Sequence, residues 1–146
     1  MEDLTPRILP ESKPQRPILL TVLCILTFIG SGMNLFSSLV IAGFYDVFVE
    51  IAHEFAEKFK LPGIDLLMEA KPMFFIVSGV FYAGSLVGAV LMMRLKKTGF
   101  HIYTVFQILL IITPMYFMHL ASPGIPELLF SGLFILLYSM NLKFMS

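Results

Sequence analysis

The stretch PILLTVLCILTFIGSGMNLFSSLVIAGFY, residues 17–45, runs for 29 residues without a charged side chain. As a single helix it would measure about 43 Å, at about 1.5 Å per residue. About 20 apolar residues are enough to cross the hydrocarbon core of a bilayer. The stretch therefore predicts a transmembrane helix that either tilts or extends beyond the membrane.

Three further uncharged stretches follow this first one, at residues 72–93, 98–126 and 128–142. Since a proline can start a helix and a terminal lysine can reach the membrane surface, the helices need not end where the uncharged stretches end. We expect four transmembrane helices in an antiparallel bundle, an all-α membrane fold over residues 17–146. The predicted spans are about 17–45, 72–94, 99–120 and 123–143.

The composition agrees with a membrane protein. Hydrophobic residues make up 58% of the 146 residues and charged residues only 14%, whereas about a quarter of a soluble domain is charged. The net charge is zero, so the chain lacks the basic footprint of a nucleic-acid-binding protein. The proline-dotted, polar tail, residues 1–16, is predicted to be disordered.

The distribution of lysine and arginine predicts the orientation. Basic residues are concentrated in the tail, in the connection 94–100 and at Lys143, and the segment 46–71 carries acids besides its lysines. Because cytoplasmic loops carry the excess of Lys and Arg, both termini are predicted to be cytoplasmic. Within the connection, Gly99 is predicted to take the left-handed conformation that ends a helix.

The segment 46–71 is predicted to be an external loop that contains an amphipathic helix. Its apolar side chains recur every three or four residues, which is typical of a helix with one apolar face. Such a helix could continue the first span or lie along the outer membrane surface. The apolar stripe begins just before this segment and consists of Phe44, Phe48, Ile51, Phe55 and Phe59.

The opposite face of this helix carries Glu50, His53 and Glu57, which could in principle bind a metal. Metal sites in helix bundles use paired Glu-x-x-His motifs and carboxylates from facing helices. Here there is one such motif, Glu50 to His53, and none of the facing uncharged stretches contains a carboxylate. We therefore expect a solvated face, with neither a metal nor a cofactor.

Small and polar residues recur at helical spacing within the predicted spans. Small side chains let helix backbones approach closely, and amides can hydrogen-bond across the contact. Some of these residues, especially the Gly84-to-Gly88 GxxxG pattern, could pack helices within the chain or form an interface with another chain. The predicted packing residues are Gly30, Asn34, Ser38, Gly84, Gly88, Ser131 and Gly132.

A second interpretation gives some polar residues a binding role. Asn34, Ser78 and Gln107 could line a path for a neutral solute, although pairing of Gln107 with Asn34 or with a serine is the simpler expectation. Near the cytoplasmic end, His101 and Tyr103 are expected as interfacial anchors. A basic cluster beside a span could alternatively contact anionic lipid headgroups; its members are Arg94, Lys96, Lys97 and His101.

Two segments carry a resemblance to a known group of proteins. RPILLTVLCILTFIGSG (residues 16–32) follows the basic tail, and LKKTGFHIYT (95–104) begins the third span. Together they resemble small four-span inner-membrane proteins of bacteria that lack an assigned function. The resemblance covers most of the chain after residue 16. It implies a bacterial cytoplasmic membrane and carries over no site residues.

No catalytic arrangement is visible, and we expect the protein not to be an enzyme. The leading hypothesis is an accessory or scaffolding subunit, or a homo-oligomer, whose partners are the lipid bilayer and other membrane proteins. The alternative is a small carrier or channel for a neutral or lipidic substrate. A third hypothesis is a metal-dependent membrane enzyme that uses Glu50, His53 and Glu57.

Overall fold

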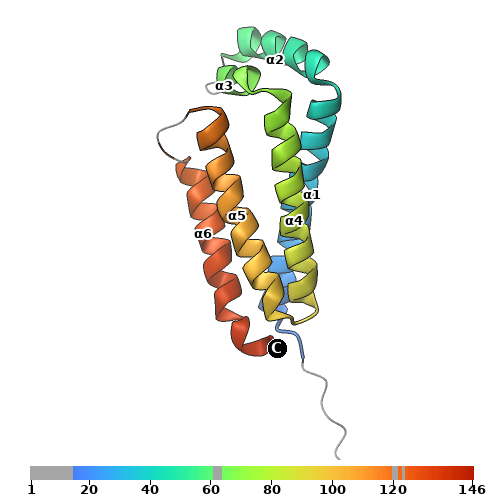
Figure 1. Cartoon of the computed structure of the whole chain (residues 1–146), viewed down its shortest axis with the longest axis vertical. Coiled ribbons are helices and arrows are strands. Elements are labelled where there is room, and N and C mark those ends of the chain that lie inside the picture. The colour runs from blue at the N-terminus through green and yellow to red at the C-terminus, as the bar shows by residue number, and fades with distance from the viewer. Residues whose placement is uncertain (1–14, 61–63, 120–121, 123) are drawn as a thin grey trace, which may run out of the picture.

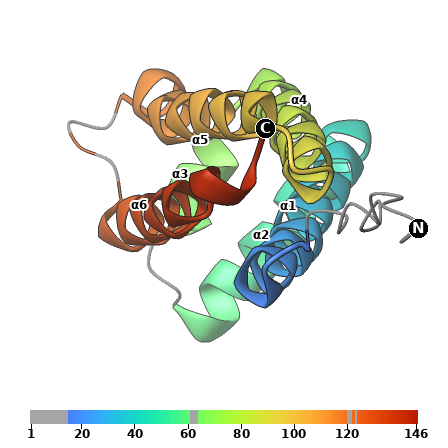
Figure 2. The same cartoon turned by 90° about the horizontal axis from the view of Figure 1, so that it is seen from below.

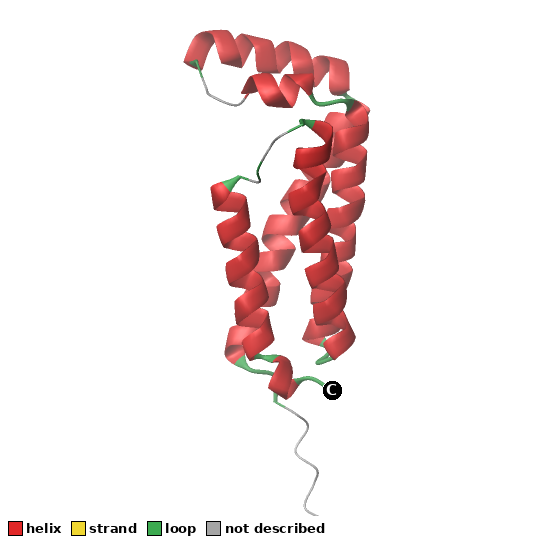
Figure 3. Ribbon diagram, turned by 60° about the vertical axis from the view of Figure 1, so that its left-hand side comes forward, coloured by secondary structure: helices red, strands yellow, loops and turns green. Residues whose placement is uncertain are grey.

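The computed structural model describes residues 15–60, 64–119, 122 and 124–146. For residues 66 and 67 it describes the backbone alone. The described residues form helices and connections, and no strand occurs among them (Figure 3). The all-helical fold is therefore confirmed for this part of the chain. The helices are α1 (Ile18–Gly43), α2 (Tyr45–Phe59), α3 (Ile64–Glu69), α4 (Pro72–Met93), α5 (Lys97–Phe117), α6 (Ile125–Met140) and a 3₁₀ turn, η1 (Leu142–Phe144).

Four long helices, α1, α4, α5 and α6, lie side by side as a bundle (Figure 1). Each is long and apolar enough to cross a membrane, when α6 is taken together with η1. The prediction of four apolar helices is thus confirmed. Residues 1–14 of the predicted tail (1–16) lie outside the described residues, as do the predicted end of the third span at 120 and the predicted start of the fourth at 123.

The bundle is tightest around α4, which packs against α1 on one side and α5 on the other, while α6 makes few contacts (Figure 2). A buried cluster holds together the end of the bundle nearest the C-terminus. Its members are Leu20, Leu23, Cys24, Ala89, Met92, Tyr103, Tyr138 and Met145.

Glycines allow α4 and α5 to approach closely. A Cβ atom added to Gly88 would lie 2.7 Å from the Tyr103 backbone nitrogen and 2.9 Å from the Gly99 carbonyl oxygen. One added to Gly99 would lie 2.6 Å from the Gly88 carbonyl oxygen. Because backbone atoms cannot move aside as a side-chain end can, any larger residue at either position would separate the helices.

The turn between α4 and α5 differs from its prediction. Leu95 takes the left-handed conformation, with φ of 59°, and its N–H donates to the Met92 carbonyl at 2.9 Å. The Lys96 N–H donates to the Leu91 carbonyl at 3.0 Å, which completes a Schellman motif. The prediction that Gly99 caps the helix is wrong, because α5 already begins at Lys97 and Gly99 serves helix packing instead.

Helix α2 does not continue α1. The chain turns at Phe44, with φ of −122° and ψ of 41°, and α2 then crosses the end of the bundle (Figure 1). The Phe48 ring packs edge-on against Phe75 of α4 at 5.7 Å between centroids. The Tyr45 hydroxyl donates to the Ala70 carbonyl at 2.6 Å. These contacts exclude a straight extension of the first helix.

Candidate functional site

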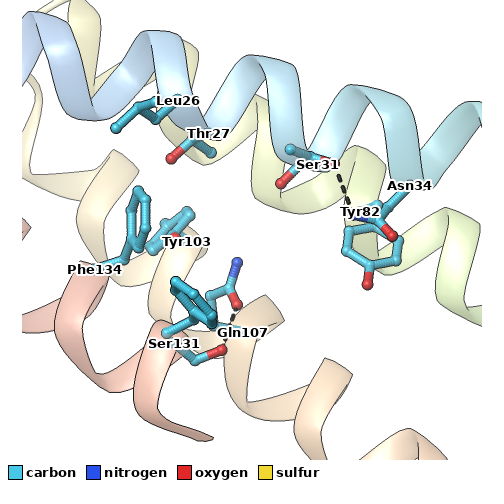
Figure 4. Close-up of a pocket in the computed structure, with 11 residues that line it drawn as sticks. Leu26, Thr27, Ser31, Asn34, Tyr82, Tyr103, Gln107, Ser131 and Phe134 are labelled. Atoms are coloured by element: carbon cyan, nitrogen blue, oxygen red, sulfur yellow. Dashed lines mark hydrogen bonds between the residues drawn. The ribbon is translucent and has the colours of Figure 1, made fainter. Parts of the chain in front are cut away.

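A cavity of about 280 Å³ lies inside the bundle and is lined by residues of all four long helices (Figure 4). Its wall combines hydroxyl and amide groups with apolar and aromatic side chains. The lining residues are Leu26, Thr27, Gly30, Ser31, Asn34, Tyr82, Tyr103, Gln107, Phe130, Ser131 and Phe134.

The cavity lies at mid-height in the bundle. Gly30, Tyr82, Gln107 and Ser131 fall near the midpoints of α1, α4, α5 and α6, respectively. Polar groups from all four helices therefore meet at one level. If these helices span a bilayer, that level is the farthest from water, where an unpaired polar group is most costly.

Gln107 organises one wall of the cavity. Its Nε2 donates to the Ser85 hydroxyl oxygen at 3.1 Å, and its Oε1 accepts from the Ser131 hydroxyl at 3.1 Å. The Gln107 side chain is 9% exposed and Ser85 is fully buried. One amide thus connects α4, α5 and α6, and Gln107 pairs with two serines, not with Asn34.

A second polar contact joins α1 to α6 beside the cavity. The Thr27 and Tyr138 hydroxyls are hydrogen-bonded at 2.7 Å. The Tyr103 ring packs edge-on against Tyr138, with 4.9 Å between centroids, and Tyr103 is only 3% exposed. The expectation that Tyr103 is an interfacial anchor is therefore wrong, since its ring turns inward to pack on Tyr138.

The cavity opens sideways between α1 and α6. Leu26 on α1 and Phe130 on α6 line it and are 49% and 64% exposed, respectively. Asn34, also exposed, donates through Nδ2 to the Gly30 carbonyl of its own helix at 2.8 Å. This bond leaves the Asn34 carbonyl oxygen free to accept a hydrogen bond from an occupant.

Two hydroxyls on the cavity wall have unused hydrogen-bonding capacity. Within the described part of the chain, neither Ser31 nor Tyr82 takes part in a side-chain hydrogen bond. Both residues line the cavity (Figure 4). Each hydroxyl can donate one hydrogen bond and accept others, so the cavity offers paired and unpaired polar groups together.

The predicted packing residues divide into three groups. Gly84 and Gly88 face α5, with the Phe106 ring next to Gly84. Gly30, Asn34 and Ser131 line the cavity. The other two packing residues lie elsewhere: Ser38 is buried beside Gly79, and Gly132 is exposed with open space around its Cβ position.

Ser78 was predicted as polar lining, but it is buried outside the cavity.

The other predicted site residues lie at the two ends of the molecule. Glu50, His53 and Glu57 are exposed on α2, and no group of three metal-binding side chains occurs in the ranges that the structure describes. At the opposite end, the basic cluster around the α4–α5 turn is exposed; it comprises Arg94, Lys96, Lys97 and His101.

Asn34 and Gln107 were predicted from the sequence as polar lining, whereas Ser31 and Tyr82 were not. One signal was available, because each of these four residues lies in the middle third of its helix. Polar residues at equal depth in different spans can meet, whatever their separation in sequence. The helical spacing within α1 predicted a packing role for Ser38 instead, and Ser38 does lie on the side of α1 that packs against α4.

Comparisons with protein families, characterised proteins and solved structures gave no match. The fold and the cavity therefore define the class: an all-helical bundle with four helices able to cross a membrane. Around the cavity, these helices place neutral polar groups at one common level.

Proposed function

We propose that this protein is a membrane-embedded, non-enzymatic binding protein or carrier for a small neutral molecule. The observation that carries the proposal is the convergence of neutral polar side chains from four helices on one cavity at their midpoints. The Ser31 and Tyr82 hydroxyls line the same cavity and make no side-chain hydrogen bond within the described residues, so both can bond to an occupant.

The chemistry of the wall favours a neutral ligand. None of the residues that line the cavity carries a charge. An ionic ligand at this depth would need a compensating charge, because burying an unpaired ion is very costly. Hydroxyls and amides instead suit a ligand that carries hydroxyl or carbonyl groups.

Native mass spectrometry of the whole protein in mild detergent tests this proposal. We expect a bound non-protein mass that Gly30→Leu removes, because Gly30 lines the cavity and a Cβ atom added there would have no atom within 4 Å. Gly32→Leu is the matched control: its Cβ also meets open space, but Gly32 does not line the cavity. Retention of the same mass by both variants would contradict the proposal.

A second candidate function is that of an accessory subunit. Gly132 on α6 is exposed and has open space around its Cβ position, so a partner helix could approach closely there. Gly84 and Gly88 do not support this candidate, because both face α5 of the same chain. A stable protein complex in the native mass spectrum, lost in Gly132→Leu, would favour it.

We also propose that the four long helices form an antiparallel bundle across a bacterial cytoplasmic membrane. In each apolar helix window, no more than 39% of the residues are buried within the bundle, which leaves a large apolar surface for lipid to cover. The described basic residues of the α4–α5 connection and of η1 lie at one end of the bundle, and α2 lies at the other end. The lysines of α2 are accompanied by acidic residues. This asymmetry supports cytoplasmic termini, with α2 along the outer surface.

A reporter enzyme fused after Ser146 tests the orientation. We expect activity from a reporter that functions only in the cytoplasm and none from one that needs the periplasm. A fusion within the exposed polar face of α2, after Glu57, should give the opposite pattern. A periplasmic signal from the Ser146 fusion would overturn the proposed topology.

A further inference from the structure

We infer that the occupant of the cavity is a membrane lipid with an uncharged, hydroxyl-bearing headgroup, which enters sideways between α1 and α6. This inference rests on the proposed binding function and names its ligand class and its route. It follows from the direction of the opening, the size of the cavity and the chemistry of its wall.

The direction of the opening selects a membrane-soluble ligand. The cavity lies near the midpoints of the helices, and its exposed lining residues, Leu26, Gly30, Asn34 and Phe130, belong to α1 and α6. In a membrane, a side opening at this level faces hydrocarbon and not water. A ligand using this route must therefore dissolve in the bilayer.

The size of the cavity separates the headgroup from the hydrocarbon tail. A volume of about 280 Å³ corresponds to roughly nine water molecules at about 30 Å³ each. That space can hold a small polar headgroup but not long acyl chains. The chains would remain in the opening, where Leu26 and Phe130 present apolar surface to them.

The wall can bind a hydroxyl in both directions. The free Asn34 carbonyl oxygen can accept a hydrogen bond from the headgroup, while the Ser31 and Tyr82 hydroxyls can donate to it or accept from it. These groups come from α1 and α4 and line one cavity. A phosphate headgroup would find no lysine or arginine among the residues that line this cavity, so a charged lipid should be rejected.

Photolabelling in liposomes tests the inference with the full chain. The probes are a diacylglycerol and a long-chain alcohol, each with a diazirine near the headgroup and an alkyne for detection. The comparison probe is a phosphatidic acid with the same acyl chains as the diacylglycerol. We expect at least one neutral probe to label α1 near Gly30 and α6 near Phe130, about fivefold more strongly than the phosphatidic acid does.

Variants distinguish the cavity from the general lipid-facing surface. Gly30→Leu should reduce this labelling about fivefold, whereas Gly32→Leu should leave it unchanged, because only Gly30 lines the cavity. A Cβ atom added at either position has nothing within 4 Å. Asn34→Leu, which changes an exposed side chain at the opening, should also reduce labelling. Equal labelling by neutral and charged probes, or labelling that Gly30→Leu does not change, would overturn the inference.

The inference can fail while the proposed function survives. A water-soluble molecule bound in native mass spectra and displaced by Gly30→Leu, with no labelling by either neutral lipid probe, would refute lipid entry and support the binding function. The absence of both lipid labelling and any Gly30-dependent bound mass would refute both.

Discussion

Gly88→Leu is expected to destabilise the isolated protein by about 3 kcal/mol or more, the upper range for overpacking a core. Even the first added carbon would lie 2.7 Å from the Tyr103 nitrogen and 2.9 Å from the Gly99 oxygen. Both atoms belong to the α5 backbone, so relief requires the two helices to move apart. Gly88→Ala should be milder, because better helix propensity offsets about 1 kcal/mol of the strain.

Unfolding in mixed detergent micelles with increasing SDS, followed by circular dichroism, measures this loss. Gly32→Leu is the matched control, because a Cβ atom added to Gly32 of α1 has nothing within 4 Å. Gly84→Ala should cost less than Gly88→Ala, since the atoms facing Gly84 belong to the Phe106 side chain, which can rotate. If Gly88→Leu unfolded at the wild-type SDS concentration, the close α4–α5 crossing would be wrong.

Gln107→Leu is expected to cost about 1–2 kcal/mol and to loosen α6. The substitution removes both hydrogen bonds that join Gln107 to Ser85 and Ser131. Interhelical hydrogen bonds in membrane proteins contribute about 0.6 kcal/mol on average and up to about 1.7 kcal/mol each. Because α6 makes few other contacts, amide hydrogen exchange in α6 should rise more than in α4.

A double-mutant cycle isolates the contact between α5 and α6. Gln107→Leu combined with Ser131→Ala should show a coupling of about 0.5–1.7 kcal/mol. Asn34→Leu is the control, because Asn34 bonds only to Gly30 of its own helix and its loss should change stability much less. Additive effects of Gln107→Leu and Ser131→Ala would show that the bond contributes nothing to stability.

These variants also show why the glycine pattern could not be interpreted from sequence. Gly84 and Gly88 form the same GxxxG pattern whether they face another helix of the chain or a second protein. Their use depends on the rotation of α4 about its axis, which contacts on both sides determine. Gly30 and Gly132, predicted for the same role, have nothing within reach of a Cβ atom.

The candidate site was predictable only in part for a related reason. Gln107 stood out as the single amide of its span, and an amide in an apolar helix needs a partner. Its partners, Ser85 and Ser131, come from two other helices. No local pattern chooses between them and Asn34, so the sequence left that pairing open.

The sequence by itself determined the all-helical architecture, the four apolar helices and the amphipathic character of α2. The absence of charged residues from a stretch, the length of that stretch and the recurrence of apolar residues every three or four positions are local properties, so each can be predicted from one segment. Tertiary structure alone decided the turn at Phe44, the inward position of Tyr103 and the bond between Thr27 and Tyr138 across 111 residues. Those features depend on the packing of one helix against another, which no single segment encodes.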